Sequence, residues 1–188
     1  SSLAVRGAEL AETHLAVQAA RDLTTKPDAP LFETLVSRID GGAKSLRFQS
    51  YVVDSLNLAL ASNEADVSLE RLTLAKAANT ASLQATYSLP ADLKSWDVQP
   101  LNFDLAVDAP ELSAFVAPES TASLNGVLKI TGKGSARDRT YNGDFVITGR
   151  NVEVQGLPMR TIDAHLQVAD NRAQFSQLEV IFDDKNSI

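Results

Sequence analysis

The chain has 188 residues, 17 Lys and Arg against 24 Asp and Glu, a formal net charge of -7 and no cysteine. This length fits one domain, and one core that buries about 70 % of the unfolded surface would need no disulfide or metal. The acidic balance, without a basic cluster, excludes nucleic acid as an expected partner. The lack of cysteine excludes disulfide scaffolds, thiolate zinc sites and cysteine nucleophiles.

The two ends of the chain indicate a piece of a longer protein. Ser1 to Val5 lack the basic start and apolar stretch of a signal peptide but already alternate as a strand does, and Ile188 arrives without a closing turn. No run approaches the roughly 20 apolar residues that span a bilayer. We therefore expect any membrane anchor to lie outside this chain.

The first predicted helix follows Asp28-Ala29-Pro30, in which an acidic N-cap precedes a proline in the first turn. Residues 31–39 are apolar at positions i, i+1, i+4, i+5 and i+8, and Gly41-Gly42 would end the helix. We expect this helix to lie as a lid on the apolar side of a sheet. A membrane-surface helix is the alternative.

From Leu46 onward, apolar and polar residues alternate with a period of two, which predicts strands with one apolar and one solvated face. This pattern is typical of antiparallel sheets. The strands of parallel sheets are covered on both faces and are therefore apolar along their whole length. The alternating segments are 46–48, 56–60, 67–69, 72–74, 83–87, 103–107, 128–130, 145–147, 152–154, 166–168 and 178–182.

Two segments interrupt the strands between residues 90 and 116. Trp96 lies between Pro90 and Pro100, in a stretch that we expect to be a loop anchored on the sheet by the indole; contact with a lipid headgroup is the alternative. Asp108-Ala109-Pro110, followed by Glu111, has a capping-box pattern and predicts a helix of one or two turns over 112–116.

An internal repeat links the two halves of the chain. Val67-x-Leu69-x-x-Leu72-x-Leu74 and Ala173-x-Phe175-x-x-Leu178-x-Val180 break their alternation at the same place, at an offset of 173 − 67 = 106 residues. One extra residue in each strand would restore the alternation, so we expect a β-bulge in both. The interpretation is a repeat unit of about 106 residues and five or six strands, with an incomplete second copy. Coincidence between common Leu-x-Leu patterns is the alternative.

The run Leu101–Phe115 resembles a recurring element of the TamB and AsmA-like family, as do 122–132, 143–145 and 149–152. The resemblance implies an all-β fold: a long curved antiparallel sheet that forms an open U-shaped, taco-like groove with one or two short capping helices. It also implies one β-groove segment, residues 1–188, of a longer periplasmic bridge in a Gram-negative bacterium, anchored in the inner membrane. Family members are implicated in moving phospholipid toward the outer membrane, and TamB in assembling outer-membrane β-barrel proteins with a partner barrel.

The expected groove lining is the apolar side chain of every second strand residue, which phospholipid acyl chains would contact without directional bonds. A closed sandwich, in which the same residues form an ordinary core, is the alternative. The set is Leu56, Leu58, Leu60, Val67, Leu69, Leu72, Leu74, Leu83, Tyr87, Phe103, Leu105, Val107, Leu128, Ile130, Ile147, Leu166, Val168, Phe175, Leu178 and Val180.

The sequence offers no arrangement of catalytic or metal-binding residues, and we expect neither an enzyme nor a cofactor. His14 and His165 each precede a Leu-x-Val run, which places both on the solvated face. Gly132-Lys133-Gly134 lacks the spacing of a phosphate-binding loop, and we expect its glycines at a bend between strands. Asp183-Asp184 is interpreted as a solvated turn rather than a weak calcium site.

Two functions remain after this exclusion. The first is a non-catalytic bridge segment that binds and conducts phospholipid along an apolar groove between the inner and outer membranes. The second is a chaperone or assembly module whose sheet edges pair with strands of an outer-membrane β-barrel protein.

Overall fold

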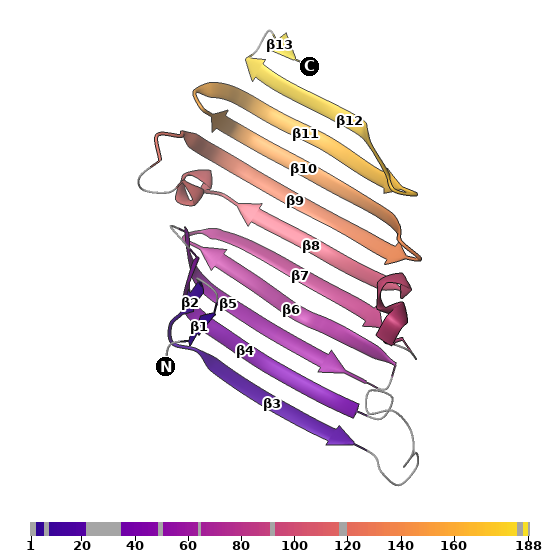
Figure 1. The fold of residues 1–188 in the computed structure, drawn as a ribbon. Helices are drawn as coiled ribbons and strands as arrows, with labels where there is room; N and C mark the ends of the chain where they lie inside the picture. The colour runs from indigo at the N-terminus through magenta and orange to yellow at the C-terminus, as the bar shows by residue number, and fades with distance from the viewer. Residues whose placement is uncertain are drawn as a thin grey trace.

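The computed structural model describes residues 3–5, 8–21, 35–48, 51–63, 65–90, 93–116, 120–183 and 186–187. They form a single 13-stranded sheet, drawn in Figure 1 as one ladder of strands from β3 to β13. The strands are β1 (Leu3–Val5), β2 (Ala8–Leu10), β3 (His14–Arg21), β4 (Leu35–Phe48), β5 (Tyr51–Ser62), β6 (Asp66–Lys76), β7 (Asn79–Ser88), β8 (Leu101–Ala109), β9 (Leu124–Arg137), β10 (Thr140–Val154), β11 (Leu157–Ala169), β12 (Arg172–Asp183) and β13 (Asn186–Ser187).

From β3 to β13 the topology is a meander in which each strand pairs with its neighbours in the chain, whereas β2 pairs with β1 and β4 and not with β3. The order is β1-β2-β4-β5-β6-β7-β8-β9-β10-β11-β12-β13, with β3 also paired to β4, and every ladder is antiparallel. The sheet is open, since β1 and β13 stand at opposite ends of this order. The predicted all-β antiparallel class is therefore confirmed.

The predicted helix over 31–39 is wrong in the part that the structure describes. Residues 35–39 begin β4, where Ile39 pairs with Val17 on one side and with Leu60 on the other. The β-branched Val36 and Ile39 favour a strand, and two neighbouring ladders outweigh the weak helical period. Asp28-Ala29-Pro30 and residues 31–34 lie outside the described residues.

The two helical segments of the described chain are short 3₁₀ helices, η1 (Leu93–Val98) and η2 (Leu112–Phe115). The expected α-helix over 112–116 is thus a single 3₁₀ turn, and its capping box does not form: Asp108 lies within β8, and Glu111 makes no side-chain capping bond. The start of η2 is held instead by Asn79. Its side-chain amide donates to the Glu111 carbonyl at 2.8 Å, and its Oδ1 accepts from the Glu111 amide at 2.9 Å.

The Asn79 side chain is buried, at 2 % exposure, whereas Glu111 is exposed, so the two hydrogen bonds between them are partly buried. We expect Asn79→Ala to lower the free energy of unfolding by about 1–3 kcal/mol, because both hydrogen bonds to the Glu111 backbone are lost. Urea denaturation measures this change. Asn102→Ala, on the exposed face of β8, is the matched control and should shift stability by less than about 0.5 kcal/mol. Equal effects of the two substitutions would contradict this role of Asn79.

Both predicted bulges are confirmed. The β6 ladders shift register between Leu69 and Leu72, and the β11–β12 ladder shifts where Leu166 pairs with Phe175 while Ala164 pairs with Leu178. The extra residue keeps Leu69 and Leu72 on one face of the sheet despite their odd spacing.

The strand register itself recurs at 106 residues. Leu56 pairs with Leu74 and Ile162 with Val180, where 162 − 56 = 106 and 180 − 74 = 106. Every residue pair given for β4–β5 and for β5–β6 has its counterpart at this offset in β10–β11 and β11–β12. Ser45 and Asn151, also 151 − 45 = 106 residues apart, both interrupt a strand with a positive φ, of 68° and 49°. The irregularities of the ladders therefore recur at corresponding places, six strands apart.

The buried core of the described residues is small and lies at one end of the strands. Leu112 of η2 packs with Ala109 and Val152, at 6 %, 1 % and 4 % exposure, where β10 continues past Asn151. The other buried apolar residues are the alanines 43, 59 and 164. The chain exposes 12402 Å² in total, whereas a compact protein of 20.1 kDa exposes roughly 8,700 Å². The expected single large core is therefore absent from the described part of the chain, and its sheet is one layer thick.

Candidate functional site: an uncovered apolar sheet face

Residues opposite each other in an antiparallel ladder point to the same face, so the register sorts the side chains into two faces. On one face, three unbroken rows of apolar residues and glycines cross the strands. Row A is Val17, Ile39, Leu60, Leu69, Ala85, Phe103, Gly134, Gly143, Val168 and Ala173; row B is Leu15, Gly41, Leu58, Leu72, Leu83, Leu105, Gly132, Phe145, Leu166 and Phe175; row C is Ala43, Leu56, Leu74, Ala81, Val107, Ile130, Ile147, Ala164 and Leu178. We call these rows and their same-face neighbours the apolar face.

All twenty residues expected to line a groove lie on the apolar face. Sixteen of them belong to rows A to C, and the other four lie two residues beyond these rows: Val67, Tyr87, Leu128 and Val180. The structure thus brings the set together along one surface. That lipid occupies this surface is a separate proposal.

Several members of the apolar face were missed from the sequence. Phe145 lies two residues before Ile147 in β10, so the same alternation could have found it. Ile39 was assigned to a helix. Gly132 and Gly134 were expected at a bend, but both lie inside the continuous strand β9, which corrects that interpretation.

The glycines of β9 accommodate two aromatic rings that lie against the sheet. A Cβ on Gly132 would stand 2.1 Å from Phe145 Cδ1, and a Cβ on Gly134 would stand 2.3 Å from Phe103 Cζ. The two rings are neighbours, with their centroids 6.3 Å apart. Because Gly132 and Gly134 have no Cβ, both phenylalanine rings lie directly against the β9 backbone. This flattens the middle of the apolar face.

Among the described residues, the Leu112 cluster packs against Val107 at one end of row C, and most of the other side chains of rows A to C are half-buried or exposed. The outermost strands are the most exposed: Leu15 and Val17 of β3 are 70 % and 59 % exposed, and Phe175 and Leu178 of β12 are 53 % and 49 % exposed. Soluble monomers rarely leave a contiguous apolar patch of this kind bare, because water disfavours it. Such a surface normally marks a binding site.

The opposite face, here called the polar face, carries charged side chains in cross-strand pairs. Lys133 lies 3.3 Å from Asp104, and Lys129 lies 3.4 Å from Asp108, all between β8 and β9. Exposed pairs of this kind contribute at most about 1 kcal/mol each. These ion pairs favour one register between β8 and β9, and their charges favour contact of this face with water.

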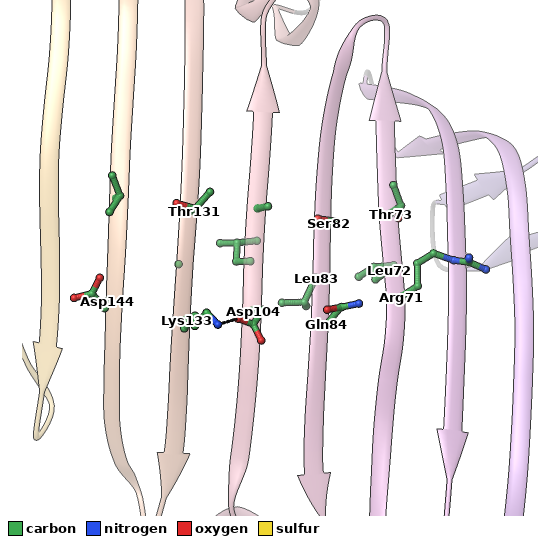
Figure 2. Close-up of a pocket in the computed structure, with 14 residues that line it drawn as sticks. Arg71, Leu72, Thr73, Ser82, Leu83, Gln84, Asp104, Thr131, Lys133 and Asp144 are labelled. Carbon is green, nitrogen blue, oxygen red and sulfur yellow. Dashed lines mark ion pairs between the residues drawn. The ribbon is translucent and has the colours of Figure 1, made fainter.

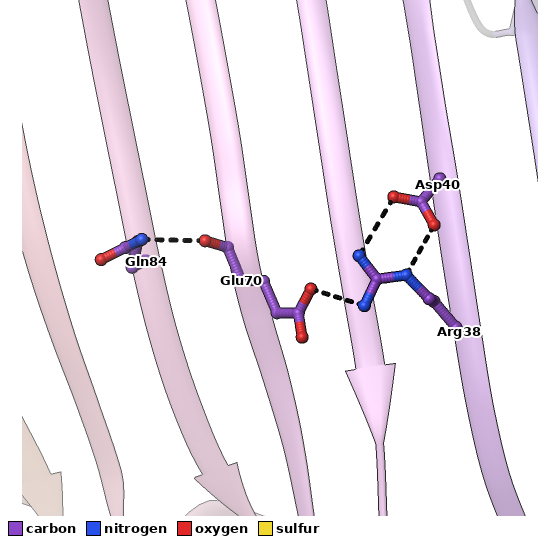
Figure 3. Close-up of polar contacts among 4 residues, drawn as sticks. All are labelled: Arg38, Asp40, Glu70 and Gln84. Atoms are coloured by element: carbon purple, nitrogen blue, oxygen red, sulfur yellow. Dashed lines mark hydrogen bonds and ion pairs between the residues drawn. The ribbon is translucent and has the colours of Figure 1, made fainter.

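A second polar cluster joins β4, β6 and β7 (Figure 3). Arg38 bonds Asp40 at 2.8 Å and Glu70 at 2.9 Å, and the Gln84 amide donates to the Glu70 carbonyl. The hydrogen bond to Asp40, the Asp40 charge and then the Glu70 charge raise the pKa of Arg38 above its ordinary value. Because Glu70 belongs to the β6 bulge, this cluster turns the extra residue toward the polar face.

The two faces differ in their hollows. An open hollow of about 660 Å³ on the polar face is lined by Arg71, Gln84, Asp104, Lys133 and Asp144 (Figure 2). A smaller one, of about 260 Å³, lies on the apolar face at Ile39, Leu60, Val67 and Leu89. The lining of the larger hollow also includes Leu72, Leu83, Leu105 and Val146 between the charged side chains, and the hollow is open to solvent. A ligand of the apolar face would therefore lie along the surface and not in a deep pocket.

His14 and His165 both lie on the polar face, as predicted. His14 pairs with Gly42 next to Leu15 of row B, and His165 pairs with Val146. His165 Nε2 lies 2.8 Å from the Asp144 carboxylate. Asp183 belongs to β12, and Asp184 lies outside the described residues.

Trp96 does not anchor its loop through the indole, which corrects that expectation. It belongs to η1, its side chain is 66 % exposed, and its backbone carbonyl accepts a hydrogen bond from the Tyr87 hydroxyl. The segment is therefore attached to the sheet through Tyr87 of β7.

Two further features are absent from the described residues. They hold no group of three or more His, Asp or Glu side chains placed to bind a metal ion. They also contain no helix that has both the length and the apolar character needed to cross a membrane.

Comparisons of the chain with protein-family models, with curated proteins and with solved structures found no match.

Proposed function

We propose that this chain is a non-catalytic segment of a longer envelope protein, and that it binds and conducts phospholipid acyl chains along its apolar face. The observation that carries the proposal is the set of rows A to C, which cross the strands without a charged side chain. Acyl chains need no directional bonds, and each CH₂ removed from water contributes about 0.8 kcal/mol. A tail can therefore slide along such rows without losing a specific contact.

The dimensions of the apolar face suit this cargo. From β3 to β12 the rows span nine strand spacings, or about 43 Å, and rows A and C lie about 13 Å apart. One leaflet of a bilayer is about 15 Å deep, so two tails fit end to end across the strands. The rows run across the strands, which is the direction in which further repeats would extend the sheet.

We propose further that the sheet curves into an open U-shaped groove around the apolar face. Each 106-residue unit contains a β-bulge, at Glu70-Arg71 and at Ser176-Gln177, and a strand residue with a positive φ, Ser45 and Asn151. These features add twist and bending at the same places in each unit. In this proposal the parent protein is anchored in the inner membrane and spans the periplasm of a Gram-negative bacterium, in keeping with the resemblance to TamB and AsmA-like proteins.

The alternative function, assembly of outer-membrane β-barrel proteins by strand pairing, is favoured by one observation. Among the described strands β3 pairs only with β4, so no other described strand lies along the outer edge of residues 14–20. A client strand could add to this edge by β-augmentation.

Native mass spectrometry of the chain purified from a Gram-negative host separates the two functions. The lipid proposal expects adducts with the masses of phospholipids, which are released by collisional activation. A lipid-free chain that forms complexes with isolated strands of an outer-membrane barrel would contradict the lipid proposal and support the alternative.

A further inference from the structure

We propose that, without lipid, two copies of this chain pair apolar face to apolar face, so that self-association and lipid binding compete for rows A to C. The competition rests on the proposed function. The pairing does not, because it follows from the uncovered area alone. The occupant of the bare face is in this case a second copy of the same sheet.

The area of the face matches what a stable dimer needs. Ten strands that are each about 4.8 Å wide and three rows that are each about 6.7 Å wide give a projected surface of roughly 960 Å². Stable interfaces bury about 800 Å² on each partner. The chain also exposes 12402 Å², well above the roughly 8,700 Å² of a compact protein of its size. One copy of the face is therefore large enough to cover another.

The distribution of charge permits this pairing. Rows A to C contain no charged residue, whereas Lys129, Lys133, Asp104 and Asp144 point to the polar face. In a face-to-face pair these charges lie on the outer surfaces, separated by two sheets that pack about 10 Å apart. This distance exceeds the screening length of about 8 Å at physiological salt. The charge of -7 on each chain therefore opposes the pairing only weakly.

The symmetry of a dimer places the most exposed apolar residues together. A two-fold axis parallel to the strands and between β7 and β8 lays β3 of one copy over β12 of the other. Leu15 and Val17 then meet Phe175 and Leu178 of the second copy, and the four are the most exposed large apolar residues of rows A to C. This pairing needs the sheet open, so in this proposal the U-shaped curvature belongs to the lipid-bound state. The low rings of Phe103 and Phe145 leave the middle of the open sheet flat enough for two twisted sheets to approach.

Sedimentation equilibrium of the delipidated full chain at tens of micromolar tests the pairing. The expected mass is twice 20.1 kDa, and it should fall to the monomer value when phospholipid in short-chain micelles is added. A monomer at 100 µM without lipid would overturn the pairing but leave the proposed function intact. A dimer that persists in lipid and carries no lipid would overturn the competition and the proposed function, while the pairing stands.

Cross-linking provides a second measurement that does not depend on disruptive substitutions. The chain has no cysteine, so Leu105→Cys places a single thiol close to the proposed two-fold axis, and Ala106→Cys places one on the polar face of the same strand. A short bis-maleimide should link most of the Leu105→Cys chains into dimers and at least five-fold fewer of the Ala106→Cys chains. Equal linking of the two variants would overturn the proposed interface.

Discussion

Replacing Gly126 by alanine is expected to destabilise the chain by about 3–5 kcal/mol in the free energy of unfolding. Gly126 of β9 has φ +106°, and a Cβ built on it would stand 2.4 Å from the Asn151 carbonyl oxygen and 2.7 Å from Val152 Cα. Both atoms belong to the backbone and cannot rotate away. The expected loss therefore includes the strain of a positive φ and the displacement of buried Val152.

Gly156 provides the matched control, since it also has a positive φ, of 80°, but has no atom within 4 Å of its would-be Cβ. Gly156→Ala should therefore lower the free energy of unfolding only by the cost of a positive φ for alanine, about 1–2 kcal/mol. Urea denaturation of the two variants measures the difference between them. If both substitutions cost the same, the close approach of β9 to Asn151 does not exist in solution.

Placing two carboxylates in row B is expected to remove lipid binding. Leu72→Asp with Leu105→Asp changes β6 and β8, which are separated by β7, so the new charges do not oppose each other directly. An aspartate on this surface must keep its water, because burying a charge under hydrocarbon is far more costly than the gain from one tail segment. We expect the ratio of bound phospholipid to protein to fall at least about tenfold, equivalent to about 1.4 kcal/mol.

The control for this variant carries the same two charges on the other face. Thr73 and Ala106 follow Leu72 and Leu105 in the same strands and point to the polar face. Thr73→Asp with Ala106→Asp should keep its lipid, and circular dichroism should show that both double variants retain the sheet. Equal loss of lipid from the two variants would mean that charge, and not the apolar rows, governs binding.

The faces of the strands could be predicted from the sequence because they depend on one local rule. Alternation with a period of two placed all twenty lining residues on one surface, from Leu56 in β5 to Val180 in β12. The bulges could also be found, because an extra residue in a strand leaves a two-residue break in strict alternation. The register of whole ladders at 106 residues could only be seen in the structure, since it depends on which strands pair.

The parts that could not be predicted depend on contacts between distant residues. The start of η2 is capped by Asn79, which is 32 residues away from Glu111 in the chain, so no local capping motif predicts this contact. The flat aromatic centre needs Gly132 beneath Phe145 on the next strand. Residues 35–39 have an apolar period that fits a helix as well as a strand, and only pairing with β3 and β5 decides between them.

The central claim is that acyl chains lie on the apolar face, and an alternating pattern along one strand tests it most directly. Each residue of β8 from Leu101 to Asp108 can be replaced singly by a cysteine carrying a fluorophore, because the chain has no native cysteine. The chain is then loaded with phospholipid that bears a nitroxide in its acyl chain, and quenching is measured. We predict strong quenching at 101, 103, 105 and 107 and little at 102, 104, 106 and 108. Equal quenching at both sets, or quenching of the even set alone, would contradict the proposed function.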